Sequence, residues 1–203
     1  MITNTIIELN KIFKTLNTQF FDGKLIEPVI LIQTKTKKNT LGTCSVNPIW
    51  EKKDDEKDKH YEITLSGGHL NRTLEEIICT LLHEMVHLYC SLNNIQDTSN
   101  NFVYHNKRFK QEAESHGLII EKAQTIGWSY STLNDTTKAF VGKMKINDGA
   151  FDYWRNAFSY DIPKKKAVAF KYQCPCGIKL RLTKTADLIC GHCKKDFELL
   201  DED

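Results

Sequence analysis

Thr73-Leu-Glu-Glu-Ile-Ile-Cys-Thr-Leu-Leu-His-Glu-Met-Val-His-Leu-Tyr-Cys-Ser-Leu92 is the segment that decides the fold. It opens with Thr-Leu-Glu-Glu, the pattern of a capping box, in which a threonine and a glutamate three residues later satisfy free backbone N–H groups at the start of a helix. Apolar residues then share one helical face: Leu74, Ile77, Ile78, Leu81, Met85 and Leu88. The pattern predicts a helix over residues 74–91 with this face in a core.

Within this helix, His83-Glu84-Met85-Val86-His87 places two imidazoles four residues apart. Four residues turn a helix through about 400°, so both side chains stand on one face, where a single zinc ion can take both. Glu84 lies about 100° round the helix from His83 and about 60° from His87. That position suits a group that accepts a proton from the attacking water better than it suits a third ligand. The alternative is two hydrogen-bonded histidines on a helix surface without a metal.

A catalytic zinc needs a third protein ligand and an open position. Metzincins place that ligand six residues after the second histidine, with a glycine at three, but Asn93 and Cys90 occupy these positions, which excludes that class. Cys44 lies upstream of the helix, as in peptide deformylases, although the residues around it differ from theirs. Five residues are candidates for the third ligand: His105, Glu112, Glu114, His116 and Cys44.

His105 is the favoured third ligand. We expect it to open a second helix over residues 104–116, after a polar loop, with Phe109 one turn further on to anchor that helix beneath the site. Gly117 ends this helix in the position that favours glycine. His116, beside it, is better suited to capping the last carbonyl groups than to binding zinc.

The flanking sequence predicts the rest of an α+β domain. Apolar residues spaced four and three apart from Ile2 to Phe20 predict an N-terminal helix that packs on the core, and residues 21–24 form a turn after it. The charged stretch 51–60 is expected to be a solvated loop or hairpin tip. Between residues 135 and 163 the apolar periodicity weakens and leaves only scattered aromatic residues, so we expect strands or loops there. Strands are predicted at 28–34, 41–46 and 61–65.

Four of the seven cysteines lie close together near the end of the chain: Cys174, Cys176, Cys190 and Cys193. Two close pairs separated by a strand-like segment are typical of a zinc ribbon with four thiolate ligands, although the first pair is one residue shorter than usual. A disulfide or redox pair is the alternative, and the clustering of four thiols disfavours it. His192 is expected to point outwards. We therefore predict a structural zinc here, in addition to the catalytic zinc.

Positive charge gathers around the first cysteine pair. Residues 162–186 contain no acidic side chain and seven basic ones: Lys164, Lys165, Lys166, Lys171, Lys179, Arg181 and Lys184. Because Phe170 and Tyr172 lie among them, this strip suits phosphate contact and base stacking, and DNA that is single-stranded or distorted is an expected partner. The alternative is that the charge offsets four thiolates on one zinc.

The composition is that of an ordinary globular protein. The 203 residues are 40% hydrophobic and 27% charged, and 28 basic against 26 acidic residues leave a net charge of +2. These values exclude a disordered or fibrous chain and point by themselves to neither nucleic acid nor a membrane. No apolar run approaches the roughly 20 residues of a spanning helix, and the first residues lack the pattern of a secretory signal. We expect a cytoplasmic protein without a membrane partner.

These features together resemble the SprT-like metallopeptidases, over most of the chain from Thr5 to Tyr130. The first cysteine pair is similar to the tight pair in the ribbon of some members. Asn106 departs from the glycine that usually follows the third histidine in Spartan-type members. The residues that carry the resemblance are Leu81-Leu82-His83-Glu84-Met85-Val86-His87, His105 with Phe109, and Phe21-Asp22-Gly23-Lys24-Leu25.

The resemblance implies a zincin-like SprT domain over residues 1–135, a connecting segment over 136–163 and a zinc ribbon over 164–203. It implies a zinc metalloendopeptidase acting on protein substrates, and Spartan-type members cut proteins crosslinked to DNA. A non-enzymatic zinc protein that binds nucleic acid or acts as a regulator is the competing expectation, but a structural site needs no carboxylate at position 84. The implied residues are His83, His87 and His105 as ligands and Glu84 as general base.

Overall fold

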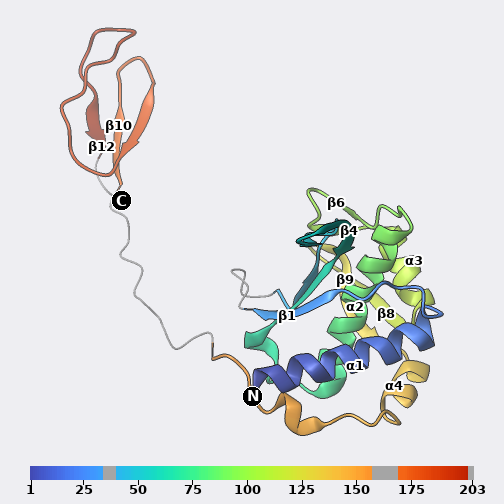
Figure 1. Cartoon of the computed structure of the whole chain (residues 1–203). Coiled ribbons are helices and arrows are strands. Elements are labelled where there is room, and N and C mark those ends of the chain that lie inside the picture. Colours follow the sequence, from blue (N-terminus) through green and yellow to red (C-terminus); the bar gives the residue numbers. More distant parts are fainter. Residues whose placement is uncertain (34–39, 157–168, 201–203) are drawn as a thin grey trace. The chain divides into compact units, whose positions relative to one another are not determined.

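A computed structural model describes residues 1–33, 40–156 and 169–200. The chain forms two compact units, Met1–Ala157 and Phe158–Asp203 (Figure 1). The last residue of the strand predicted at 28–34 lies outside the described residues, as do Lys164, Lys165 and Lys166 of the basic strip. None of the helices in the described ranges combines the length and apolarity that crossing a lipid bilayer requires.

The N-terminal helix α1 spans Ile2–Phe20, as predicted. Its buried apolar face packs into the main core. The chain leaves the helix through Asp22 and Gly23, which both have left-handed backbone angles (φ 55° and 69°). This conformation is one that glycine adopts without cost, and it confirms the predicted turn.

The sheet ahead of the central helix has three strands in the order β1-β5-β2. β1 runs parallel to β5, and β2 runs antiparallel to it. The charged stretch before β5 forms an antiparallel hairpin of β3 and β4, as expected for 51–60. The bounds are β1 (Val29–Gln33), β2 (Gly42–Cys44), β3 (Trp50–Lys52), β4 (Asp55–His60) and β5 (Glu62–Ser66).

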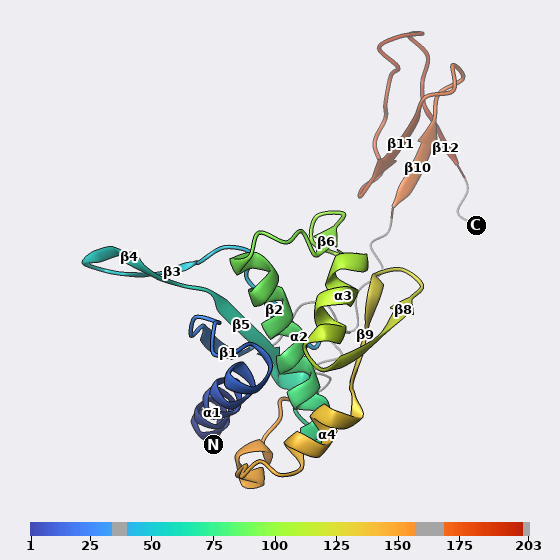
Figure 2. The same ribbon diagram turned by 90° about the vertical axis from the view of Figure 1, so that its right-hand side faces the viewer.

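Helix α2 spans Leu74–Leu92 and follows a short 3₁₀ turn, Gly67–His69. The predicted capping box is present: the Thr73 hydroxyl accepts a hydrogen bond from the Glu76 N–H, and the Glu76 carboxylate accepts one from the Thr73 N–H. The apolar face of α2 is buried in the core cluster. Figure 2 shows α2 between the first sheet on one side and α3 with β9 on the other.

The second sheet has the order β6-β7-β9-β8, and α3 lies between β7 and β8 in the chain. The helix predicted at 104–116 starts later than expected, because residues 104–105 form a strand that pairs with β6 and β9. Gly117 (φ 94°) ends α3 as predicted. The bounds are β6 (Thr98–Ser99), β7 (Tyr104–His105), α3 (Lys107–Ser115), β8 (Leu118–Ala123) and β9 (Gly127–Leu133).

The expectation of strands or loops over residues 135–163 is wrong for residues 135–141, which are helical. Asp135–Val141 form helix α4, which Asn134 caps by accepting a hydrogen bond from the Thr137 N–H, and Asp148–Phe151 form a 3₁₀ turn. Seven residues make barely two turns, which is too short for helical periodicity to show. Side chains from this region, such as Phe140, pack against the core.

The second unit is a three-stranded antiparallel sheet in the order β11-β10-β12. The first two cysteines follow β10, and the other two lie in the long connection between β11 and β12. The structure thus has the predicted α+β class, with helices and small sheets followed by a separate cysteine-bearing unit. The bounds are β10 (Phe170–Gln173), β11 (Lys179–Leu182) and β12 (Glu198–Leu200).

Candidate metal centres

Three histidines meet in the first unit. His83 and His87 stand one turn apart on α2, and His105 is brought opposite them by β7, which pairs with Gly127 of β9. Their Nε2 atoms are 3.2 Å (His83 to His87), 3.2 Å (His83 to His105) and 3.1 Å (His87 to His105) apart. Three nitrogen atoms from two elements therefore converge on one point.

The other nitrogen of each ring has a partner behind it. His87 Nδ1 lies 2.5 Å from Asp97 Oδ2, and His105 Nδ1 lies 3.3 Å from the carbonyl oxygen of Ile126. A carboxylate and a carbonyl only accept, so both Nδ1 atoms donate and both Nε2 atoms present bare lone pairs. His83 Nδ1 lies 2.7 Å from the Ser131 hydroxyl. The three rings are thus oriented with Nε2 forward.

This arrangement fits a zinc ion. Zinc–nitrogen bonds of about 2.05 Å at tetrahedral angles put ligand nitrogens about 3.3 Å apart, close to the separations of 3.1–3.2 Å seen here. Burial, followed by the charge of His87, lowers the pKa of His105 to about 4, and burial lowers the pKa of His83 well below its usual value. Both imidazoles are therefore held in the neutral form that binds metals.

None of the four alternative ligands belongs to a group of close potential ligands among the described residues. His116 instead ends α3: its Nδ1 lies 2.7 Å from the Glu112 carbonyl oxygen, and its ring stacks on Phe21. This is the capping role expected of it. Burial, then the charge of Glu84, raises the pKa of Cys44, which favours the thiol over the metal-binding thiolate. The Glu114 carboxylate is paired with a lysine instead, since its Oε1 lies 3.6 Å from Lys110 Nζ.

Phe109 forms the floor of the histidine cluster. It is fully buried, and its ring centroid lies 4.5–4.7 Å from the centroids of all three imidazoles. His105 was expected to open α3, but it lies one residue before the N-cap residue of that helix, Asn106. The predicted anchoring by Phe109 is nevertheless present, because its buried ring packs against all three imidazoles. Asn106 Oδ1 caps α3 by accepting hydrogen bonds from the N–H groups of Arg108 and Phe109.

Glu84 is positioned between the two histidines of α2 in sequence and is 5% exposed. Its side chain lies against Gly42 of strand β2. A buried carboxylate that directly follows one of the converging histidines on the same helix suits general-base chemistry at a metal.

Sequence reasoning missed two residues of this site, Asp97 and Ser131. Although burial alone would raise the pKa of Asp97, the hydrogen bond and charge of His87 hold it below its usual value, so Asp97 is a carboxylate that stabilises the His87 ring. A signal for Asp97 did exist, since it is the only acidic residue between His87 and His105. Ser131 gave none, because a lone serine carries no metal-site pattern and its contact with His83 forms only on folding.

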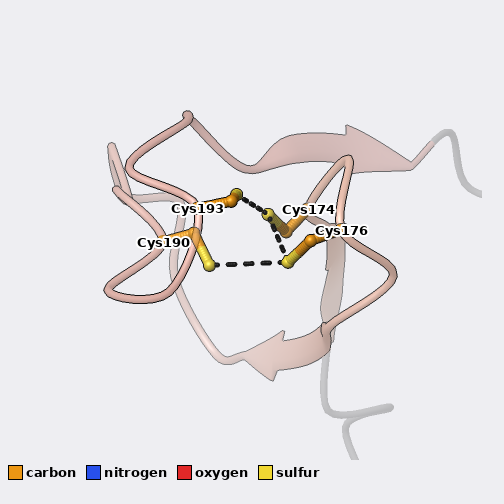
Figure 3. Close-up of side chains that lie close together, drawn as sticks. All are labelled: Cys174, Cys176, Cys190 and Cys193. Atoms are coloured by element: carbon orange, nitrogen blue, oxygen red, sulfur yellow. Dashed lines mark hydrogen bonds between the residues drawn. The ribbon is translucent and has the colours of Figure 1, made fainter.

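The four cysteines meet in the second unit (Figure 3). Their sulfurs are 3.2 Å (Cys174 to Cys176), 3.1 Å (Cys174 to Cys193) and 3.7 Å (Cys176 to Cys190) apart, and all four are free thiols. A disulfide requires about 2.05 Å, whereas tetrahedral zinc–sulfur bonds of about 2.3 Å put sulfurs about 3.8 Å apart. Backbone N–H groups of Cys193 and His192 lower the pKa of Cys190 to about 6. The cluster could therefore hold a metal ion.

Comparison with known proteins agrees with this geometry. A scan of protein-family models matches the SprT-like family over residues 9–127, which run from α1 to the start of β9 and include Glu84 and the three histidines. No curated protein gives a match. The second unit lies outside the matched range. Because the match covers more than half of the 203 residues and coincides with the histidine site, the chain belongs to the SprT-like family.

Proposed function

We propose that this protein is a zinc-dependent endopeptidase. The observation that carries the proposal is the convergence of three imidazole Nε2 atoms within 3.1–3.2 Å, with a buried glutamate directly after His83 on α2. The SprT-like family is in keeping with a metallopeptidase-like domain. A second, structural zinc at the four cysteines completes the proposal, and cytoplasmic reducing conditions suit thiolate ligands.

In the proposed mechanism His83, His87 and His105 would hold the zinc. The chemistry that zinc supplies there when bound is Lewis acidity, which eases the loss of a proton from water and polarises the peptide carbonyl. Glu84 accepts the proton of the attacking water at a carboxylate oxygen and returns it to the departing amine nitrogen. Phe109 fills the space beneath the imidazoles and excludes water from that side.

Replacing Glu84 by glutamine tests the proposed function. Glutamine keeps the shape of the side chain but cannot take the proton, so cleavage of an unfolded protein by the zinc-loaded Glu84→Gln variant should fall about 10²–10⁴-fold. The matched control is Glu75→Gln, an exposed glutamate on the same helix, which should keep full activity. Zinc content, measured on the same samples, should be unchanged in both. A Glu84→Gln variant as active as the wild type would contradict the mechanism.

We further propose that the second unit binds DNA and so brings the peptidase to proteins bound or crosslinked there. Lys171 stands opposite Arg181 in the register of β10 and β11, and Gln173 stands opposite Lys179. Side chains of such pairs, two residues apart along each strand, lie on one face of the sheet. Three exposed basic residues therefore share a face that suits phosphate contact.

Tyr172 does not take the stacking role expected of it. It lies on the opposite face of the sheet, is 5% exposed, and its hydroxyl accepts a hydrogen bond from the Ala186 N–H. The proposal for DNA therefore rests on interactions with the phosphate backbone, which carry no sequence information.

Charge reversal tests the DNA proposal. In Lys171→Glu/Arg181→Glu, affinity for single-stranded DNA should fall, and the log–log salt slope should decrease by about 0.7 for each phosphate that the variant no longer neutralises. Lys57→Glu, on the exposed hairpin of the first unit, is the control and should bind as the wild type does. Absence of binding at low salt, measured by fluorescence anisotropy, would favour the alternative that this charge only offsets the thiolates.

A further inference from the structure

Gly42 lies directly against the carboxylate of Glu84. A Cβ atom built on Gly42 would stand 2.7 Å from Glu84 Oε1, 3.0 Å from its Cγ and 3.1 Å from its Cδ. Carbon contacts in proteins normally begin near 3.5 Å, so even a methyl group does not fit here. The Glu84 side chain occupies the space that any other residue at position 42 would fill.

The backbone of Gly42 gives no separate reason for a glycine. Its φ lies outside the left-handed region, and it sits in strand β2, where glycine is unfavourable because it loses more conformational freedom on folding. A glycine within a strand often marks a place where another group approaches closely. In this structure that group is the Glu84 side chain.

Neither backbone can retreat easily from this contact. β2 is held to β5 by its ladder, in which Gly42 stands opposite Leu65, and by the hydrogen bond of the Ser66 N–H to the Leu41 carbonyl oxygen. On the other side, α2 is fixed by its buried apolar face. A side chain added at position 42 must therefore displace the Glu84 carboxylate.

We propose that Gly42 is a positioning residue for Glu84, since its lack of a side chain leaves the space that the carboxylate occupies between β2 and α2. The consequence for catalysis rests on the proposed function, in which Glu84 is the general base. The contact itself does not depend on that function, and the two parts are tested separately.

Melting temperature tests the contact. Gly42→Ala should lower the melting temperature of the wild type by about 2–12 °C, as overpacking against a buried side chain does in a chain of this size. In a Glu84→Ala background the three clashing atoms are gone, so the same substitution should cause no decrease. Gly149→Ala is the control, because its Cβ would stand 3.5 Å or more from its neighbours. An equal decrease in both backgrounds would overturn the proposal.

Activity tests the consequence. With zinc content unchanged, Gly42→Ala should lower kcat about 10²-fold, the cost of displacing a catalytic group by about 1 Å. In a Glu84→Gln background it should cause no further decrease, because effects that pass through one group are not additive. If Gly42→Ala lowered kcat by the same factor in the wild type and in the Glu84→Gln background, the proposal would be overturned. Gly42 would then act independently of Glu84, as a residue that touches the substrate does. If the wild type cleaves nothing, the proposed function fails, and the melting temperatures still decide the contact.

Discussion

At the scale of single residues, the histidine site depends on the hydrogen-bond partner of the Nδ1 atom in each ring. His87 donates to Asp97, His105 donates to the Ile126 carbonyl, and His83 is paired with Ser131. The carboxylate and the carbonyl select the tautomer of His87 and His105, and all three partners keep the rings in place before a metal arrives. Metal affinity should therefore depend on residues that do not touch the metal.

Asp97→Asn is the sharpest test of this dependence. The amide keeps the shape but loses the negative charge that stabilises the His87 ring, so zinc affinity at the histidine site should fall about 10–100-fold. The exposed Asp54→Asn on the β3–β4 hairpin is the control. Competition with a chromogenic chelator measures both variants, and unchanged affinity in Asp97→Asn would show that the hydrogen bond does not support binding.

The pH dependence of stability follows from the lowered pKa values of His83 and His105. In the zinc-free protein both groups take up protons more readily when the chain is unfolded, so stability increases with pH across this range. The free energy of unfolding should be highest above about pH 6.5 and fall as the pH drops towards 4. His60 opposes this trend, because hydrogen bonds to the Glu27 carbonyl oxygen and to Asp58 raise its pKa.

Urea unfolding followed by tryptophan fluorescence measures this trend, because all three tryptophans lie in the first unit: Trp50, Trp128 and Trp154. A His105→Gln variant should show a shallower decrease than the wild type between pH 6.5 and 4. An equal decrease in the two proteins would mean that His105 is not the group responsible.

At the scale of elements, the junction of β7 and α3 places the third histidine. Asn106 stabilises this junction through its side chain and its backbone. Its Oδ1 caps α3, and its Nδ2 donates a hydrogen bond to the Gln96 carbonyl oxygen. Its backbone N–H donates a hydrogen bond to the Asp97 carbonyl oxygen. The asparagine at this position thus has a structural role. Asn106 joins the strand of His105, the helix of Phe109 and the loop of Asp97.

Substitutions at Asn106 should separate these roles. Asn106→Ala removes the cap and the bond to Gln96, and the free energy of unfolding should fall by about 1–2 kcal/mol. Asn106→Asp keeps an oxygen that can cap the helix and should be destabilised less. Equal stability of the alanine and aspartate variants in urea denaturation would contradict the capping role.

Elements whose causes are local were predictable from the sequence. The capping box at Thr73 and the apolar periodicity after it predicted α2 almost to the residue. β7 could not be predicted, because its two residues become a strand only by pairing with the equally short β6 and, through His105, with Gly127 further along the chain. In β9 the signal was present and not used, since Gly127–Leu133 contains aromatic and β-branched residues typical of strands.

At the scale of the whole molecule, the two units differ in how far apart in sequence their site residues lie. The four cysteines lie within twenty residues, so their spacing alone indicated a shared site. The histidine site joins positions 22 residues apart, and its support from Ser131 comes from 48 residues away. The pentamer on α2 was recognisable from local spacing, whereas Asp97 and Ser131 become part of the site only through folding.

The number of zinc ions per chain tests the central claim most directly. Metal analysis of the purified protein, after dialysis to remove loosely bound ions, should give two zinc ions in the wild type and one in His105→Ala, because the cysteine cluster retains its own ion. One zinc in the wild type and the same one in His105→Ala would contradict the account, since the three converging imidazoles would then not form a metal centre.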